Sequence, residues 1–175
     1  MINNKSVLIT GGTGSFGKRY VKIILERFKP RRLVIYSRDE LKQFEMQQKY
    51  NDPCMRYFIG DVRDASRLIQ AMRGIDYVIH AAALKQVPAA AYNPMECIKT
   101  NIHGAKNVID AAIASVVQKV VALSTDQAAN PLNLYGATKL AYDMRFVSAH
   151  HIFWVDHPRL SGGVHRHVVG SRGPV

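Results

Sequence analysis

Short apolar runs alternate with stretches of helical periodicity over residues 1–148 of the chain. The apolar runs are rich in Val and Ile, and they predict five short strands, at residues 7–10, 32–36, 55–59, 77–80 and 119–124. The stretches between and after them predict helices at about residues 18–28, 40–49, 65–73, 95–115 and 134–148. Such alternation is typical of an α/β fold, in which a doubly wound parallel sheet carries helices on both faces.

The first predicted strand leads directly into three glycines, Gly11, Gly14 and Gly17, and a helical pattern follows them. Gly11 permits a tight turn, Gly14 lets the backbone approach an anion, and Gly17 lets the helix pack close to its strand. The free N–H groups and the positive dipole end of the helix N-terminus suit a pyrophosphate. This context predicts the dinucleotide-binding loop of a Rossmann fold, with these residues at the cofactor: Gly11, Thr13, Gly14, Ser15, Phe16 and Gly17.

The residues after the second predicted strand indicate which dinucleotide is bound. NAD sites usually place an acidic residue there to accept a hydrogen bond from the ribose 2′-hydroxyl, whereas this chain has Ser37 and Arg38. A guanidinium can pair with a 2′-phosphate, so the sequence predicts NADP as the cofactor. Asp39 is the next residue and keeps NAD open as the alternative.

Two further strand ends predict contacts with the cofactor. Asp61 and Val62 follow the third predicted strand, where a carboxylate suits the amino group of adenine. The alternative for Asp61 is a cap of the helix that begins near residue 65. Ala81 and Ala82 follow the fourth strand, and their small side chains let the backbone pass close to the cofactor.

Candidate catalytic residues follow the fifth predicted strand, where Thr125 and Asp126 precede Tyr135 and Lys139. A spacing of four residues puts Tyr135 and Lys139 on one face of a helix, so we expect the ammonium near the phenol. A free tyrosine has a pKa of about 10, and a neighbouring cation favours the phenolate, which can take a proton from an alcohol. Together with the glycine loop, this pattern predicts oxidation of an alcohol by hydride transfer to the dinucleotide.

Length and composition fit one globular domain of 175 residues, 47% of them hydrophobic. No apolar run is long enough to span a membrane and the N-terminus lacks a signal-peptide pattern, so we expect a cytoplasmic protein without a membrane partner. Cys54 and Cys97 lack metal-like spacing and are expected to be reduced thiols. The basic residues behind the net charge of +11 are dispersed and form no ladder with aromatic residues, which argues against nucleic-acid binding.

These motifs resemble the extended short-chain dehydrogenase/reductase family. More narrowly, they resemble the inverting UDP-N-acetylglucosamine 4,6-dehydratases of bacterial flagellin-sugar (pseudaminic acid) and capsule synthesis. The resemblance is continuous over residues 1–148. The segments that carry it are ITGGTGSFG at 9–17, YSRDELKQFEM at 36–46, AAALKQVP at 81–88, NPMEC at 93–97, TD at 125–126, ANP at 129–131 and NLYGATK at 133–139.

The resemblance implies a role for each residue of the predicted catalytic group. Tyr135 and Lys139 assist hydride transfer from the sugar C4 to NADP⁺, which gives a 4-keto sugar with an acidified proton at C5. Thr125 holds the 4-hydroxyl, Lys85 belongs to the substrate pocket, and Asp126 protonates the departing 6-hydroxyl before hydride returns to C6. The substrate is then UDP-N-acetylglucosamine, and subunits are expected to self-associate through the helix of Tyr135 or its neighbours.

Gln127 departs from the family pattern, in which a lysine, the base at C5, follows Thr-Asp. A carboxamide cannot abstract a proton, so we expect slow dehydration or oxidation without elimination. Three function classes stay open: an impaired dehydratase, a module that binds NADP without turnover, and a fragment that does not fold stably. A nucleotide-sugar 4-epimerase is a further alternative, which Asp126 discriminates because epimerases need no acid there.

Residues 149–175 differ in composition, and we expect them to form an aberrant, poorly ordered tail. Five of the seven histidines lie between His150 and His167 without metal-ligand spacing in a clear element, so no metal is predicted. Because residues 168–173 resemble the family again, our hypothesis for this segment is a compensated frameshift in the gene. Family members continue well beyond residue 175, so a sixth strand and the C-terminal substrate domain, with most of the UDP-sugar pocket, are expected to be missing.

Overall fold

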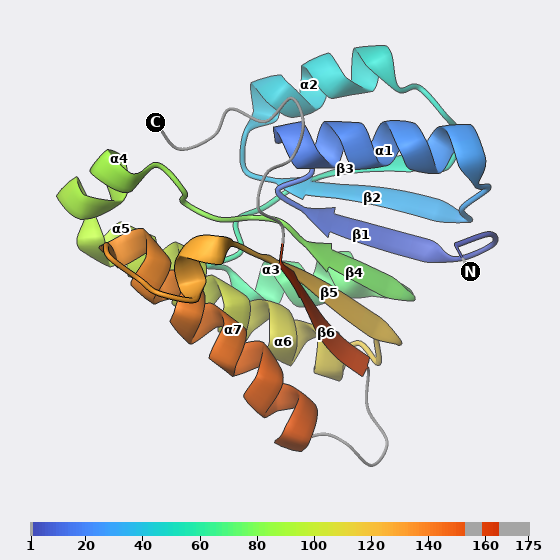
Figure 1. Ribbon diagram of the computed structural model, residues 1–175. Coiled ribbons are helices and arrows are strands. Elements are labelled where there is room, and N and C mark those ends of the chain that lie inside the picture. The colour runs from blue at the N-terminus through green and yellow to red at the C-terminus, as the bar shows by residue number, and fades with distance from the viewer. Residues whose placement is uncertain (1, 153–158, 165–175) are drawn as a thin grey trace.

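Six parallel strands form a single sheet in the order β3-β2-β1-β4-β5-β6 (Figure 1). The computed structural model describes residues 2–152 and 159–164, with side chains for residues 2–149. The strands are β1 (Ser6–Thr10), β2 (Arg32–Ser37), β3 (Met55–Ile59), β4 (Tyr77–His80), β5 (Lys119–Ser124) and β6 (Arg159–Val164). The strand order reverses between β1 and β4, and at such a switch point a crevice opens beyond the carboxyl ends of the strands.

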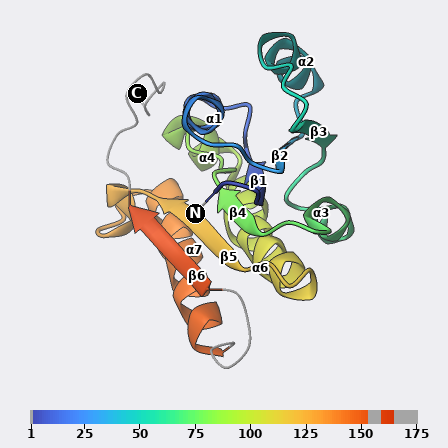
Figure 2. The same cartoon turned by 90° about the vertical axis from the view of Figure 1, so that its right-hand side faces the viewer.

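Helices cover both faces of the sheet (Figure 2). On one face lie α1 (Ser15–Arg27) and α2 (Glu40–Lys49), and on the other lie α3 (Ala65–Met72), α6 (Gly104–Ala114) and α7 (Leu134–Ile152). After β4 come α4 (Val87–Tyr92), α5 (Pro94–Ile98) and the π-helical turn η1 (Lys99–His103), and after β5 comes the 3-10 turn η2 (Asp126–Ala128). The predicted doubly wound α/β fold is confirmed. Within the described ranges, no helix is both long and apolar enough to cross a membrane.

Successive side chains of the central strands β1, β2, β4 and β5 enter opposite layers of the core. One set packs against α3, α6 and α7: Leu8, Val34, Val78 and Val120. The other set packs against α1 and α2: Val7, Ile9, Leu33 and Ile35. A parallel sheet covered on both faces buries side chains on both sides of its central strands, which explains why β1 and β2 appear as continuous apolar runs rather than as alternating patterns.

The helix predicted over residues 95–115 is interrupted by the π-helical turn η1. Inside that turn, the side-chain amide of Asn101 donates to the carbonyl oxygen of Leu84 and to Thr138 Oγ1, both at 3.0 Å. Its oxygen accepts from the N–H group of Leu84 at 2.9 Å. These hydrogen bonds join η1 to segments 17 and 37 residues away, so local periodicity does not reveal the interruption.

The C-terminal part of the described chain differs from the prediction. β6 pairs in parallel with β5, from Lys119 beside Arg159 to Ser124 beside Val164. The expectation of a missing sixth strand is therefore wrong, because β6 supplies partners for the N–H and C=O groups along that edge of β5. The helix α7 also continues to Ile152, past the predicted end at residue 148. The rest of the predicted tail, residues 153–158 and 165–175, lies outside the described residues, as do the side chains of the clustered histidines.

Candidate functional site

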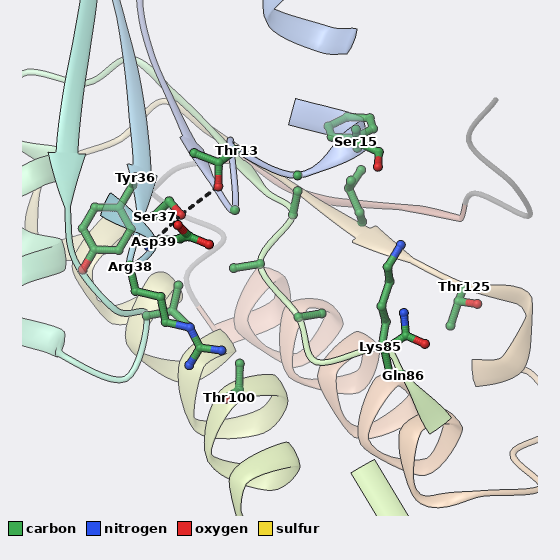
Figure 3. A pocket seen from close by; sticks show the side chains of 18 of the residues that line it. Thr13, Ser15, Tyr36, Ser37, Arg38, Asp39, Lys85, Gln86, Thr100 and Thr125 are labelled. Carbon is green, nitrogen blue, oxygen red and sulfur yellow. Dashed lines mark hydrogen bonds between the residues drawn. The ribbon is translucent and has the colours of Figure 1, made fainter. Parts of the chain in front are cut away.

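A pocket of about 650 Å³ opens at the carboxyl ends of β1 to β5 (Figure 3). This is the place where ligands bind in doubly wound sheets. The predicted site residues that line it are Gly11, Thr13, Gly14, Ser15, Phe16, Ser37, Arg38, Asp61, Val62, Ala81, Ala82, Lys85, Thr125, Asp126, Tyr135 and Lys139. Gly17 is buried where α1 meets the glycine turn and does not form part of the pocket wall.

The turn between β1 and α1 requires glycine for steric reasons. Gly11 has a φ angle of +65°, and a Cβ atom there would lie 2.9 Å from the backbone of Ala82. A Cβ atom on Gly17 would lie 2.1 Å from the carbonyl oxygen of Gly12, so α1 can approach the turn this closely only with glycine at that position. Gly14 is the N-cap of α1 and provides no side-chain cap, which leaves the helix N-terminus suited to an anion.

Polar residues at the end of β2 have different tasks. The Ser37 hydroxyl is buried 2.9 Å from Thr13 Oγ1, and this contact ties β2 to the glycine turn. Asp39 caps α2 by accepting from the N–H group of Lys42 at 3.0 Å, and it also pairs with the Lys42 ammonium. These hydrogen bonds lower the pKa of Asp39. Asp39 is therefore committed to the start of α2, whereas Arg38 extends into the pocket (Figure 3).

The carboxylate of Asp61, just beyond β3, is held by two guanidinium groups. Arg63 donates to its Oδ2 atom from Nε at 3.0 Å and Nη2 at 2.8 Å, and Arg38 Nη1 lies 3.5 Å from the same oxygen. Burial disfavours ionisation, but the hydrogen bonds from Arg63 outweigh it, so the pKa of Asp61 lies below its ordinary value. The alternative role of Asp61 as a helix cap is wrong, because Asp64 caps α3 by accepting from the N–H group of Arg67 at 2.9 Å.

The backbone of Ala81 and Ala82 passes beside the glycine turn, as their small side chains predict. Their N–H groups donate to Thr10 Oγ1 at 3.2 and 3.3 Å, and the same oxygen lies 2.6 Å from Nδ1 of His80. Burial, together with the charge of Lys139, lowers the pKa of His80 to about 3, so the imidazole is neutral. Among the described residues, Nε2 of His80 has no hydrogen-bond partner.

Thr125, Asp126 and Gln127 form the turn that follows β5. Thr125 Oγ1 donates to Asp126 Oδ1 at 3.2 Å, accepts from the N–H group of Gln127 at 3.4 Å and is hydrogen-bonded to Tyr135. The carboxamide oxygen of Gln127 lies 3.5 Å from Asn133 Nδ2. The pocket therefore holds a hydroxyl, a carboxyl group and a neutral amide on consecutive residues, close to a phenol.

The contact predicted between Lys139 and Tyr135 is replaced by other contacts. The Lys139 ammonium donates to the carbonyl oxygen of Leu123 at 2.7 Å and lies 3.4 Å from the centre of the Tyr142 ring. Burial raises the pKa of Tyr135, and the hydrogen bond with Thr125 offsets this only in part. The expectation that a neighbouring cation lowers this pKa is wrong for this arrangement, because a buried ammonium turns to the nearby carbonyl and aromatic face.

Some pocket residues went unnoticed in the sequence. Gln86 lines the pocket beside Lys85, whose side chain extends into it from the loop after β4, and Thr100 lines it from η1 (Figure 3). Tyr142 lies under Lys139 without reaching the surface. Its position three residues after Lys139 on a helix was a usable signal. Thr100 had none, since its orientation depends on the π-helical turn.

The residues present fit a dinucleotide. The glycine turn has no room for a Cβ atom at Gly11, and it lies beside the N-terminus of α1, which has no side-chain cap. A turn and a helix N-terminus of this kind suit a pyrophosphate. Arg38 supplies a positive charge at the next strand end, and Asp61 and Val62 follow at the third. Thr125 and Tyr135 lie across the same pocket, where a second reactant would meet the far end of the dinucleotide.

Comparison with known proteins agrees with this architecture. The chain matches the family model described as polysaccharide biosynthesis protein over residues 7–175. It is 64% identical over 175 residues to the UDP-N-acetylglucosamine 4,6-dehydratase (inverting) of Campylobacter jejuni subsp. jejuni serotype O:2, an alignment that covers 100% of this chain and 52% of the relative. It is 47% identical over 146 residues to the UDP-glucose 4-epimerase of Rickettsia akari, covering 79% of this chain and 42% of that relative.

A solved structure matches over the whole of this chain. The X-ray structure of Pen from Bacillus thuringiensis has a TM-score of 0.95 and 43% sequence identity, over 100% of this chain and 54% of that one. The chain therefore spans about half the length of the curated relatives and of the structure that it matches.

Proposed function

Because the chain belongs to the polysaccharide biosynthesis protein family, we propose that it is the cofactor-binding half of an inverting nucleotide-sugar 4,6-dehydratase that acts on UDP-N-acetylglucosamine. The observation that carries the proposal is that the glycine turn and Arg38 line the same pocket as Thr125, Asp126 and Tyr135. Hydride transfer requires the dinucleotide and the alcohol to be held together in such a place. Identity of 64% to a relative of that name, over the whole chain, supports the same reaction.

We infer that the cofactor is NADP. Arg38 extends into the pocket with its side chain 54% exposed, and its ion pair with Asp61 is shared with Arg63. A 2′-phosphate could therefore take over the guanidinium of Arg38 while Arg63 continues to neutralise Asp61. Asp39, the residue that would suit NAD, caps α2 instead. These contacts favour a phosphorylated ribose.

When bound, NADP⁺ supplies the hydride acceptor, and residues of this chain handle the protons. Thr125 positions the sugar 4-hydroxyl, and Tyr135, its hydrogen-bond partner, takes the proton from that hydroxyl. The raised pKa of Tyr135 makes its phenolate a strong base but a scarce one at neutral pH. Lys139 lies one turn along α7, but its ammonium contacts the carbonyl oxygen of Leu123 and the ring of Tyr142. The hydrogen bond from Thr125 is therefore the contact that favours the phenolate in this arrangement.

Asp126 and Gln127 occupy the positions that would act in the elimination of water. Asp126 would protonate the departing 6-hydroxyl, and Lys85, from the loop after β4, would contact the nucleotide sugar. Gln127 stands where the family pattern has a basic lysine, and its carboxamide is joined to Asn133 instead. Loss of a general base typically costs about 10²–10⁴-fold in rate, so we expect C4 oxidation to outrun elimination.

Gln127 also favours a second candidate, a module that binds NADP without turnover. The two candidates share the pocket and differ in whether product forms. A 4-epimerase-like oxidoreductase is a further alternative, since it would use the same threonine, tyrosine and lysine for oxidation at C4. A cytoplasmic location, a role in flagellin-sugar or capsule synthesis and self-association through α7 or its neighbours complete the proposal.

Calorimetric titration of the 175-residue chain with NADP⁺ and NAD⁺ is the first test. Saturable binding that is tighter for NADP⁺ is the expected result, and it justifies turnover assays with UDP-N-acetylglucosamine. Formation of a 4-keto-6-deoxy sugar identifies a dehydratase, whereas formation of the 4-epimer identifies an epimerase. Binding without any product supports the non-catalytic module. Absence of heat with both dinucleotides refutes the cofactor role of the pocket.

A further inference from the structure

The face of the Tyr142 ring lies against the ammonium of Lys139. The nitrogen is 3.4 Å from the ring centre, and the two residues are 1% and 3% exposed. On its other contact, the ammonium donates to the carbonyl oxygen of Leu123, 2.7 Å away, near the end of β5. Both Lys139 and Leu123 line the pocket, so this arrangement sets where the positive charge sits in the candidate site.

The ring of Tyr142 is itself fixed by several contacts. Its hydroxyl donates to the carbonyl oxygen of His80 at 3.3 Å, and its ring stacks on the His80 imidazole with centroids 5.4 Å apart. Phe146 packs against both rings, with centroids 4.9 Å from Tyr142 and 6.0 Å from His80. His80 in turn contacts Thr10, which accepts from the pocket backbone. The ring is therefore held by β4 and α7 together.

The ring of Tyr142 stabilises the charged form of the buried Lys139 side chain. Leu123 satisfies one of its three donors, and burial removes the water that would otherwise stabilise its charge. The face of an aromatic ring carries negative potential and attracts a cation most strongly where water is excluded. The ring of Tyr142 presents this face to the charged ammonium of Lys139.

The other titratable groups near Lys139 do not replace this contact. Asp143 on α7 favours the charged form of Lys139, but its carboxylate accepts a hydrogen bond from Ser124. His80, from β4, is neutral and has an uncharged ring. Tyr135 lies one turn earlier on α7 and is hydrogen-bonded to Thr125. Other charged groups line the same pocket from other elements: Lys18, Arg38, Asp39, Lys42, Asp61, Lys85 and Asp126.

We propose that Tyr142 is a positioning residue whose ring face holds the ammonium of Lys139 in its charged form at the end of β5. The assignment of a catalytic task to Lys139 rests on the proposed function, whereas the contact itself does not. The ring then has two effects on the site. It keeps the charge next to the turn that carries the candidate catalytic residues, and it opposes loss of the proton that burial favours.

The test is an NMR titration of the Lys139 side chain in protein labelled with ¹³C at lysine Cε, with Lys139→Met identifying the resonance. Tyr142→Leu should lower the pKa of Lys139 by about one, a tenfold rise in acid dissociation, because the cation loses its aromatic partner. Tyr142→Phe keeps the ring and should lower it by less than about half as much. Equal titration of Lys139 in wild type, Tyr142→Phe and Tyr142→Leu would overturn the proposal.

Phe146→Leu is the matched control, because it removes a neighbouring ring of the same stack but not the one against the ammonium. It should lower the free energy of unfolding without changing the pKa of Lys139. A pKa change as large as that in Tyr142→Leu would show that looser core packing, rather than the contact with the ring of Tyr142, causes the effect. Replacing Tyr142 with pentafluorophenylalanine keeps an aromatic shape and reverses the potential of the ring face. This replacement should lower the pKa as Tyr142→Leu does, so the test does not depend on a truncated core.

Binding and turnover separate this inference from the proposed function. Should wild type turn over, Tyr142→Leu should move the alkaline limb of the activity profile to lower pH, because the active form requires protonated Lys139. Tyr142→Phe should leave that limb in place. If wild type binds no NADP⁺, the proposed function is contradicted. The NMR titration of Lys139 then still tests its contact with Tyr142. Normal NADP⁺ binding with an unaltered titration contradicts the contact alone.

Discussion

Lys139 should make the stability of this protein depend on pH in a direction opposite to that of most surface lysines. The residue is 3% exposed, and burial lowers its pKa from 10.5 to about 8, against the favourable charge of Asp143. Between these two values the unfolded chain binds more protons than the folded chain. The free energy of unfolding therefore rises as pH increases through 8 towards 10.5, and the cost of burying the charged form is fully present below pH 8.

The magnitude follows from the size of the pKa change. One pKa unit corresponds to 1.36 kcal/mol, so the lowering to about 8 is worth about 3 kcal/mol over the full range. Between pH 7 and pH 9.5, the same two pKa values give a gain of about 2 kcal/mol in the free energy of unfolding. A change of this size is a large fraction of the total stability of a small domain.

The assay compares urea unfolding of wild type and Lys139→Met at pH 7, 8, 9 and 9.5, followed by circular dichroism. Other groups titrate in both proteins, so the difference between them reports Lys139. We expect wild type to gain about 2 kcal/mol relative to Lys139→Met across this range. Lys106→Met is the control, because Lys106 is half-exposed in a surface pair with Asp110, and its difference should stay flat. A flat difference for Lys139→Met as well would show that its ammonium is solvated and refute the reasoning.

Three further predictions concern the pocket. Gly17→Ala places a Cβ atom 2.1 Å from the backbone of Gly12, so it should lower the urea midpoint by an amount equivalent to about 1–3 kcal/mol and abolish NADP⁺ binding in calorimetry. Gly14→Ala, whose Cβ would lie 3.2 Å from the nearest atom, should fold normally, and equal midpoints for the two variants would contradict the steric argument. Arg38→Met should weaken NADP⁺ binding about 10- to 100-fold and NAD⁺ binding little, because only NADP⁺ loses a charged hydrogen bond to its 2′-phosphate. Equal losses of affinity for both dinucleotides would count against a 2′-phosphate site. Gln127→Lys should speed water elimination from UDP-N-acetylglucosamine by about 10²–10⁴-fold with little change in C4 oxidation. The measurement is the ratio of dehydrated product to C4-oxidised sugar, and an unchanged ratio would show that this position does not supply the base.

Much of the fold was predictable because its causes are local. Strand runs at 55–59 and 77–80 and the helix at 40–49 have the predicted bounds, since each depends on the character of its own side chains. The interrupted helix at η1 and the strand β6 were not predicted. The first depends on Asn101 bonding to Leu84 and Thr138, and the second on pairing with the edge of β5.

The candidate site shows the same division. The glycine turn, Arg38 and the sequence from Thr125 to Lys139 were assigned to one pocket, because strand ends of a parallel sheet meet at one edge, and the structure brings them together there. The direction of Lys139, the partners of Asp61 and the supporting ring of Tyr142 were missed or misjudged. Each of these depends on which acceptors, charges and rings surround a side chain after folding.

By itself, the sequence determined the parallel α/β architecture and the shape of the phosphate-binding turn. Apolar periodicity decides which faces are buried, and a turn with no room for a Cβ atom accepts glycine alone. The tertiary structure alone decided how the charges are held. A buried ammonium must find partners that replace water, and Leu123 on β5 meets Lys139 on α7 only when the sheet assembles. Arg38, after β2, reaches the partly buried Asp61, after β3, for the same reason.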